Sequence, residues 1–87
     1  MYKTIIKSYI KKLSLQDVID FSNKYDINLS NDEASLILDY IKNEYETFLY
    51  GNPDRIFNDI KLKLDSDKYS KLESLYYEFK DKYKNYL

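Results

Sequence analysis

Acidic side chains are the residues of this chain that come closest to a catalytic set. Asp17 and Asp20 are three residues apart, and Asp32 and Glu33 are adjacent. Two carboxylates that face each other across a cleft can hydrolyse a glycosidic bond. Acids near the start of a helix also offset its dipole, and charged side chains are seldom buried without partners. We therefore expect these carboxylates to have a structural role on solvated helix ends and faces.

The other common catalytic groups are missing. The sequence has no His, no Cys and one Gly. A Ser-His-Asp triad, a Cys-His dyad and the usual zinc sites each need His or Cys. A Rossmann or P-loop phosphate cradle needs several glycines. We therefore expect no catalytic residue, no metal site and no cofactor, and the protein is predicted not to be an enzyme.

One segment resembles the start of a calcium-binding loop. From Asp26 to Asp32, oxygen-bearing side chains stand at alternate positions. An EF-hand loop needs Gly at its sixth position and a bidentate Glu at its twelfth. Asn31 and Ile37 stand there, so this segment is predicted not to bind calcium.

Charge is unevenly distributed along the chain. Residues 1–13 have four lysines and no acid, residues 14–59 have ten acids and three bases, and residues 60–87 have seven lysines and five acids. Such separation can orient the approach of a charged partner. Lysines interleaved with tyrosines can also track a nucleic-acid strand, which is the alternative function. A net charge of −1 and a single Arg argue against that alternative.

The apolar residues recur with the spacing of α-helices, and one Gly and one Pro leave few signals for the tight turns of a sheet. A helix is predicted over residues 2–13, with its apolar side in the core rather than on a membrane. It is followed by a helix that has Ser14 as N-cap and Asp17 in its first turn. The predicted buried faces of these two helices are Tyr2, Ile6, Tyr9 and Leu13, and Val18, Phe21 and Tyr25.

A third helix is predicted to start at Ser30, because Ser30 and Glu33 form a capping box before an apolar run. Gly51 is expected to end it. Whether this helix stays regular from Glu44 to Tyr50 is open. Its predicted buried face is Ala34, Ile37, Leu38, Ile41, Tyr45 and Phe48.

Two more helices are predicted in the last third of the chain. One has Asn52 as N-cap and Pro53 at its first helical position. The other is capped by Asp65 or Ser66. The first is predicted to bury Ile56 or Phe57, together with Ile60 and Leu64, and the second has apolar residues at Tyr69, Leu72, Tyr76, Phe79, Tyr83 and Tyr86.

The apolar seam of the last helix has two interpretations. Its residues are three or four positions apart, which is typical both of a coiled-coil face and of a helix packed in its own core. Tyrosine is also enriched at the energetic centres of protein interfaces. The side chains predicted to form an interaction surface are Lys3, Lys7, Lys11, Tyr50, Tyr77 and Tyr86, and the three tyrosines are expected to be exposed.

The sequence also resembles a known family. Between Ile6 and Ser35 it reads Ile-x-x-x-Ile-x-x-Leu-Ser-x-x-Asp-Val-Ile-x-Phe-Ser-x-x-Tyr-x-Ile-x-Leu-Ser-x-x-Glu-Ala. The likeness continues at Phe48, Arg55, Ile60, Leu75 and Phe79. The C-terminal tail is richer in tyrosine than the family pattern. This pattern is similar to that of small uncharacterised helical proteins of low-GC Gram-positive bacteria, domain of unknown function 2624. The resemblance implies a small helical protein and assigns no activity and no site residues.

These observations predict an all-α protein, a compact bundle of four or five helices in which residues 1–87 form one domain. No apolar run reaches the roughly 20 residues that span a bilayer, and lysines interrupt the first apolar stretch. We therefore expect a cytoplasmic location. The predicted function is a non-enzymatic protein-protein interaction module that binds a protein partner or itself.

Overall fold

The computed structural model describes the backbone of residues 2–86 and the side chains of residues 3–85. Within this range it has five α-helices, one short 3-10 helix and no strand, so the all-α prediction is confirmed. The elements are α1 (Tyr2–Lys12), α2 (Leu15–Lys24), α3 (Asn31–Tyr50), α4 (Asp54–Lys63), α5 (Ser66–Lys82) and η1 (Lys84–Tyr86).

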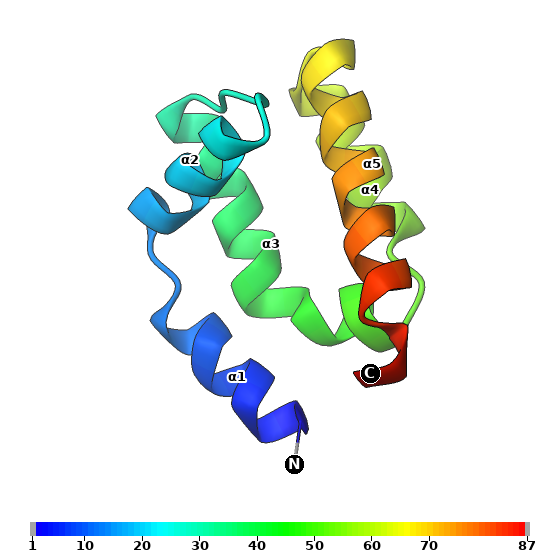
Figure 1. Cartoon of the computed structure of the whole chain (residues 1–87). Coiled ribbons are helices and arrows are strands. Elements are labelled where there is room, and N and C mark those ends of the chain that lie inside the picture. Colours follow the sequence, from blue (N-terminus) through cyan, green and yellow to red (C-terminus); the bar gives the residue numbers. More distant parts are fainter. Residues whose placement is uncertain (1, 87) are drawn as a thin grey trace.

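The long helix α3 separates two pairs of helices (Figure 1). Both α1 and α2 pack on α3, whereas α4 and α5 pack on each other on the far side of it. The start of α1 and the end of α5 lie toward the same end of the molecule (Figure 1). None of the described helices is both long enough and apolar enough to cross a membrane.

Two reciprocal capping boxes fix the starts of α2 and α3. The Ser14 hydroxyl accepts from the Asp17 backbone N–H at 3.1 Å, and the Asp17 carboxylate accepts from the Ser14 N–H at 3.0 Å. Ser30 and Glu33 make the same pair of bonds at 3.2 and 2.8 Å. The predicted helix starts are therefore confirmed, and these acids have the structural role expected of them.

Acid is expected to loosen these helix starts. The Lys68 ammonium and the Ser30 N–H lower the pKa of Glu33 below its ordinary value of 4.5. A carboxyl group of this kind stabilises the fold fully above its ordinary pKa, and this contribution is lost as the pH falls through the folded-state pKa. We expect Glu33→Gln, which cannot titrate, to lose less stability between about pH 7 and about pH 3 than the parent protein. Urea unfolding at both pH values measures this, and an equal loss in the two proteins would contradict it.

Helix α3 is kinked at Glu44, which answers the question left open by the sequence. Glu44 has non-helical dihedral angles (φ −134°, ψ 29°), and the helix continues beyond it to Tyr50. Figure 1 shows the end of α3 turning toward α4. The Arg55 guanidinium of α4 holds the Glu44 carboxylate at 3.0 Å. Gly51 ends the helix as predicted, in an extended conformation (φ −111°).

The start of α4 differs from the prediction by one residue. Pro53 is the N-cap, and α4 begins at Asp54. The Asn52 side-chain oxygen accepts from the Asp54 backbone N–H at 3.0 Å, so Asn52 still pairs with an N–H of the first turn. Of the two residues predicted as possible caps of α5, Asp65 is the N-cap and Ser66 is the first helical residue.

The core lies between the two pairs of helices and α3. Ile60 and Leu64 are buried as predicted, and Ile56 and Phe57, which the prediction gave as alternatives, are both buried. Both apolar residues of the loop between α2 and α3 are buried as well. The buried apolar side chains are Val18, Ile27, Leu29, Ala34, Ile37, Ile56, Phe57, Ile60, Leu64 and Leu75.

Three aromatic residues predicted to be buried are exposed instead. Phe21 is 43% exposed, Tyr25 is 37% exposed and Tyr9 is 74% exposed. Helix α2 turns Val18 and Ser22 toward α3, which leaves the adjacent stripe of Phe21 and Tyr25 on the open side. Likewise, Ile6 and Ile10 of α1 and Leu13 just after it are partly buried, and the exposed Tyr9 lies beside that face.

Ser22 explains the orientation of α2. Its hydroxyl donates to the Ile19 carbonyl at 2.8 Å and accepts from the Leu29 backbone N–H at 3.4 Å. The side chain is 3% exposed. A buried hydroxyl that is fully hydrogen-bonded can take a core position at little cost.

Candidate interaction groove

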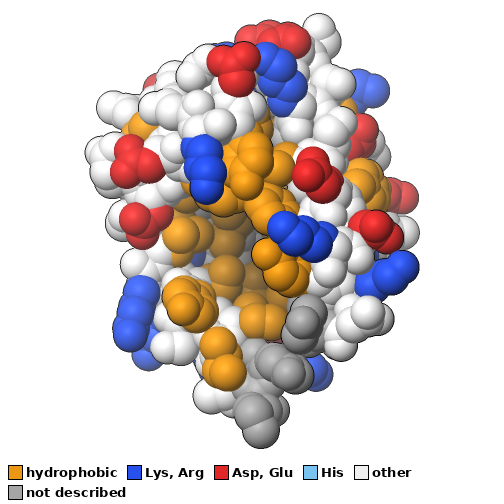
Figure 2. Space-filling view, in the orientation of Figure 1, with side chains coloured by type: hydrophobic (Ala, Val, Ile, Leu, Met, Phe, Trp, Pro, Cys, Tyr) orange, Lys and Arg blue, Asp and Glu red, His pale blue; other side chains and the backbone are white. Residues whose placement is uncertain are grey.

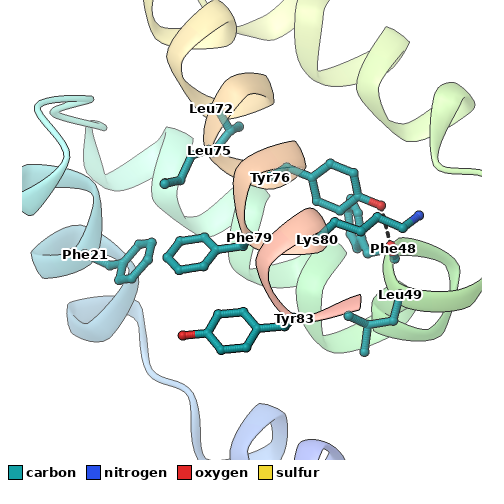
Figure 3. Close-up of a pocket in the computed structure, with 9 residues that line it drawn as sticks. All are labelled: Phe21, Phe48, Leu49, Leu72, Leu75, Tyr76, Phe79, Lys80 and Tyr83. Carbon is teal, nitrogen blue, oxygen red and sulfur yellow. Dashed lines mark hydrogen bonds between the residues drawn. The ribbon is translucent and has the colours of Figure 1, made fainter. Parts of the chain in front are cut away.

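Four aromatic rings span the gap between α2 and the end of α5, and we call them the aromatic bridge. Phe21 comes from α2 and Phe79 from α5, whereas Tyr25 and Tyr83 are the residues that follow these two helices. The ring centroids of Phe21 and Phe79 are 5.7 Å apart, and Tyr25 meets Phe79 edge-on at 6.0 Å. Tyr83 stacks on Phe79 at 6.0 Å. Figure 3 shows Phe21, Phe79 and Tyr83 grouped together.

Three rings of the bridge, Phe21, Phe79 and Tyr83, line one or both of two hollows. These hollows share Phe21, Leu72 and Leu75 and together form the central groove. Their volumes are about 410 and 270 Å³. Figure 2 shows the groove as a hollowed strip of hydrophobic side chains between the two halves of the molecule. The other lining residues are Ile10, Leu13, Asp17, Val18, Ser22, Ile27, Leu29, Ile37 and Ile41 in the larger hollow, and Phe48, Leu49, Tyr76, Phe79, Lys80 and Tyr83 in the smaller one.

The side chains that line the groove are suited to apolar contact rather than to catalysis. Asp17 is the one carboxylate in its lining, and that carboxylate is engaged in the capping box of α2. No second acid faces Asp17 in the lining of either hollow. Acid-base hydrolysis needs two such groups across the substrate. In the described part of the chain, no group of three Asp or Glu residues is placed to hold a metal ion.

At one end of the groove, which we call the closed end, two lysines of α5 bind groups on the opposite side. Lys68 binds the Glu33 carboxylate at 2.8 Å, and Lys71 donates to the Asp26 carbonyl at 3.0 Å. The Glu33 carboxylate raises the pKa of Lys68, and the Asp67 and Asp26 carboxylates raise that of Lys71. These two lysines therefore already have anionic partners.

The opposite end, which we call the open end, is bordered by α1 and by the end of α5 (Figure 1). On the face in Figure 2, both acidic and basic side chains border the upper half of the groove, and only basic ones are visible around the lower half. Lys80 lines the groove with its Nζ 5.6 Å from the Tyr76 ring centroid. Among the described side chains, Lys80 has no carboxylate within ion-pair distance.

Three of the residues predicted to form an interaction surface meet beside α1. Lys3 Nζ lies 5.0 Å from the centroid of the Tyr50 ring, which is 40% exposed. Lys7 joins them in a separate hollow of about 350 Å³. Lys11 is exposed, and its backbone carbonyl accepts from Lys42 Nζ at 3.2 Å.

The other predicted surface residues do not join this group. Tyr77 is 49% exposed and stacks on Phe57 with a centroid distance of 6.4 Å, on the side of α4. The Tyr86 side chain lies outside the described residues. Sequence reasoning missed the aromatic bridge as a group, because it assigned Phe21 and Tyr25 to the core. A second stripe on α2, formed by Val18 and Ser22, was the available signal.

Comparison with protein families matches residues 1–80 to the family described as "Protein of unknown function (DUF2624)". Comparison with curated proteins and with solved structures gives no match. Since the match covers nearly the whole chain, including all of α1 to α4 and most of α5, this protein belongs to the DUF2624 family.

Proposed function

We propose that this protein is a cytoplasmic, non-enzymatic interaction module that binds a protein partner or a second copy of itself through the central groove. The observation that carries the proposal is the aromatic bridge. Phe21 and Tyr83 are each more than a third exposed and line the smaller, apolar hollow, and Tyr25, which is also more than a third exposed, lines a neighbouring hollow that shares Leu75 with it. Contiguous apolar surface of this kind is typical of a site that another molecule covers.

The energetics of the rings support binding. Full burial of a large apolar side chain contributes about 1.5–3 kcal/mol, so covering the exposed part of one ring contributes about 1 kcal/mol. Aromatic side chains also lose little conformational entropy on binding, because they have two side-chain torsions. Several such rings in one groove therefore make it the strongest candidate for an interface core in the described part of the chain.

Phe21→Lys is the variant that tests this function. The substitution places a lysine ammonium in the apolar wall of the groove, so we expect the protein to lose its co-purifying partners or its self-associated species. Helix content should stay unchanged, because Phe21 is outside the buried core. Pull-down with mass spectrometry and light-scattering mass across a concentration series measure both forms of binding. Circular dichroism checks the fold.

Tyr9→Lys is the matched control, since Tyr9 is 74% exposed and lines neither hollow of the groove. It should keep every complex that the parent protein forms. Complexes that survive Phe21→Lys unchanged, or a strictly monomeric protein that lacks any partner and turns over a substrate, would refute the interaction module.

A weak nucleic-acid-associated protein is the second candidate, favoured by lysines placed against aromatic rings. Lys3 lies 5.0 Å from the Tyr50 ring centroid, and Lys82 lies 5.6 Å from that of Tyr83. A titration of labelled single-stranded DNA by fluorescence anisotropy at two salt concentrations tests it. Binding through phosphate contacts must weaken with salt, because counterions are released. Absence of salt-sensitive binding at micromolar protein would remove this candidate.

A further inference from the structure

We propose that the partner presents an amphipathic helix to the central groove, with an apolar seam on the aromatic bridge and acidic side chains at the open end. This inference rests on the proposed function and names the chemistry of the partner. It follows from three properties of the groove: helical walls, a concave apolar floor, and unpaired lysines at one end.

The walls of the groove favour a helical occupant. The described residues that line it come from helices and from the short loops between them, so they offer no strand edge with free backbone groups. An extended peptide on this floor would leave its own N–H and C=O groups buried without partners. A helix satisfies these groups internally and presents only side chains to the groove.

The shape of the apolar surface favours a protein segment over a membrane surface. Phe21, Leu72 and Leu75 lie where the two hollows meet, and Figure 2 shows the hydrophobic strip recessed between the two halves. A protein that rests on a bilayer presents its apolar side chains outward, as an amphipathic helix does. A recessed strip is instead complementary to the ridge of side chains on one helix.

The charge of the open end favours acidic side chains on that ridge. Helix α1, which borders this end, carries Lys3, Lys7, Lys11 and Lys12 and no acid, and Lys3 and Lys7 share their separate hollow with Glu46 of α3. On the opposite wall, Lys80 lines the groove without a carboxylate partner among the described residues. By contrast, the lysines of the closed end are paired with Glu33, Asp26 and Asp67. Complementary potentials steer association and fix the direction in which a partner lies.

Two designed peptides test the inference on the full chain. Both are fluorescein-labelled helices of about 18 residues, roughly five turns, with leucines at positions i, i+3, i+4 and i+7. One has Glu and the other Lys at the polar positions that flank the seam. By fluorescence anisotropy, we expect the Glu peptide to bind at least about tenfold more tightly than the Lys peptide. Raising the salt concentration should reduce this difference.

Variants locate the binding to the groove. Phe21→Lys removes an apolar contact, and Lys80→Glu reverses the unpaired charge. Each variant is expected to bind the Glu peptide about tenfold more weakly than the parent protein does. Lys61→Glu on α4 makes the same charge change at a residue that lines neither hollow of the groove, and it should leave the affinity unchanged. Because the three substituted residues lie outside the buried core, helix content measured by circular dichroism should stay the same.

Three outcomes would overturn the inference. The first is that the Glu peptide does not bind, and the second is that the two peptides bind with equal affinity. The third is that neither peptide binds, while the protein binds vesicles of anionic phosphatidylglycerol and Phe21→Lys abolishes this binding. Failure of the proposed function is distinguishable, because it appears as complexes that Phe21→Lys does not disturb. If Phe21→Lys removes those complexes while the Glu peptide does not bind, the interaction module stands and only the partner's chemistry is wrong.

Discussion

Replacing Phe57 by Ala is expected to lower the free energy of unfolding by about 3–5 kcal/mol. The Phe57 side chain is 5% exposed, and its ring meets those of Phe48, Tyr69, Tyr76 and Tyr77 with centroid distances of 5.0 to 6.4 Å. Truncation therefore removes contacts between α4 and both α3 and α5. A protein of this length has a total stability of about 4–13 kcal/mol, so the loss is a large fraction of the total and would unfold much of the variant at the low end of this range.

Tyr69 gives this prediction a second measurement. Burial, together with a hydrogen bond to Glu73, raises the pKa of Tyr69 from 10.0 to about 12. A cavity at Phe57 admits water to that ring, so the pKa of Tyr69 should fall back toward 10.0 in the folded fraction of Phe57→Ala. Urea unfolding gives the stability, and tyrosinate absorbance during alkaline titration gives the pKa. A stability loss below about 1 kcal/mol would contradict the packing described for α4.

Ile60→Ala is expected to have the second largest effect, a loss of about 2–5 kcal/mol in unfolding free energy. Ile60 is 2% exposed and faces the core, whereas Leu62, two residues along the same helix, is 85% exposed. Leu62→Ala removes the same number of carbon atoms from the opposite face. Its effect should stay within about 0.5 kcal/mol, because Ala is also the better helix former.

Comparison of Ile60→Ala with Leu62→Ala separates the effect of burial on stability from the effect of helix propensity. Urea unfolding of the two variants under identical conditions gives both values, with the denaturant dependence checked for two-state behaviour. Equal losses in Ile60→Ala and Leu62→Ala would mean that α4 is rotated from the orientation described above, and that the core of the second helix pair is wrongly assigned.

The sequence predicted the parts of the fold that depend on local chemistry. Ser14 and Ser30 start helices because each hydroxyl reaches an orphan N–H three residues on, and the matching acid stands at the third position of the helix. The spacing of Ile60 and Leu64 placed them on the same apolar face of a short helix, and the structure buries that face. Such signals act within one turn and do not depend on neighbouring elements.

The candidate groove was not predictable in the same way. Apolar spacing shows which residues share a helix face, but not whether another element covers that face. Phe21 and Tyr25 have the periodicity of a core stripe, yet α2 turns Val18 and the hydrogen-bonded Ser22 toward α3 instead. The sequence likewise left open whether α3 is kinked at Glu44, because the non-helical dihedral angles of Glu44 accompany a tertiary contact with Arg55. These features arise from how helices meet.

The start of α1 and the end of α5 both border the open end of the groove, which has a practical consequence for anyone who fuses another polypeptide to this protein. An affinity tag or fluorescent protein joined beyond residue 2 or residue 86 starts beside the lysines of α1 and α5 (Figure 1). A fused acidic linker at either terminus is held near those lysines at high effective concentration and would occupy the same space as a docked helix. Affinities should therefore be measured after the tag has been cleaved, or with a neutral linker.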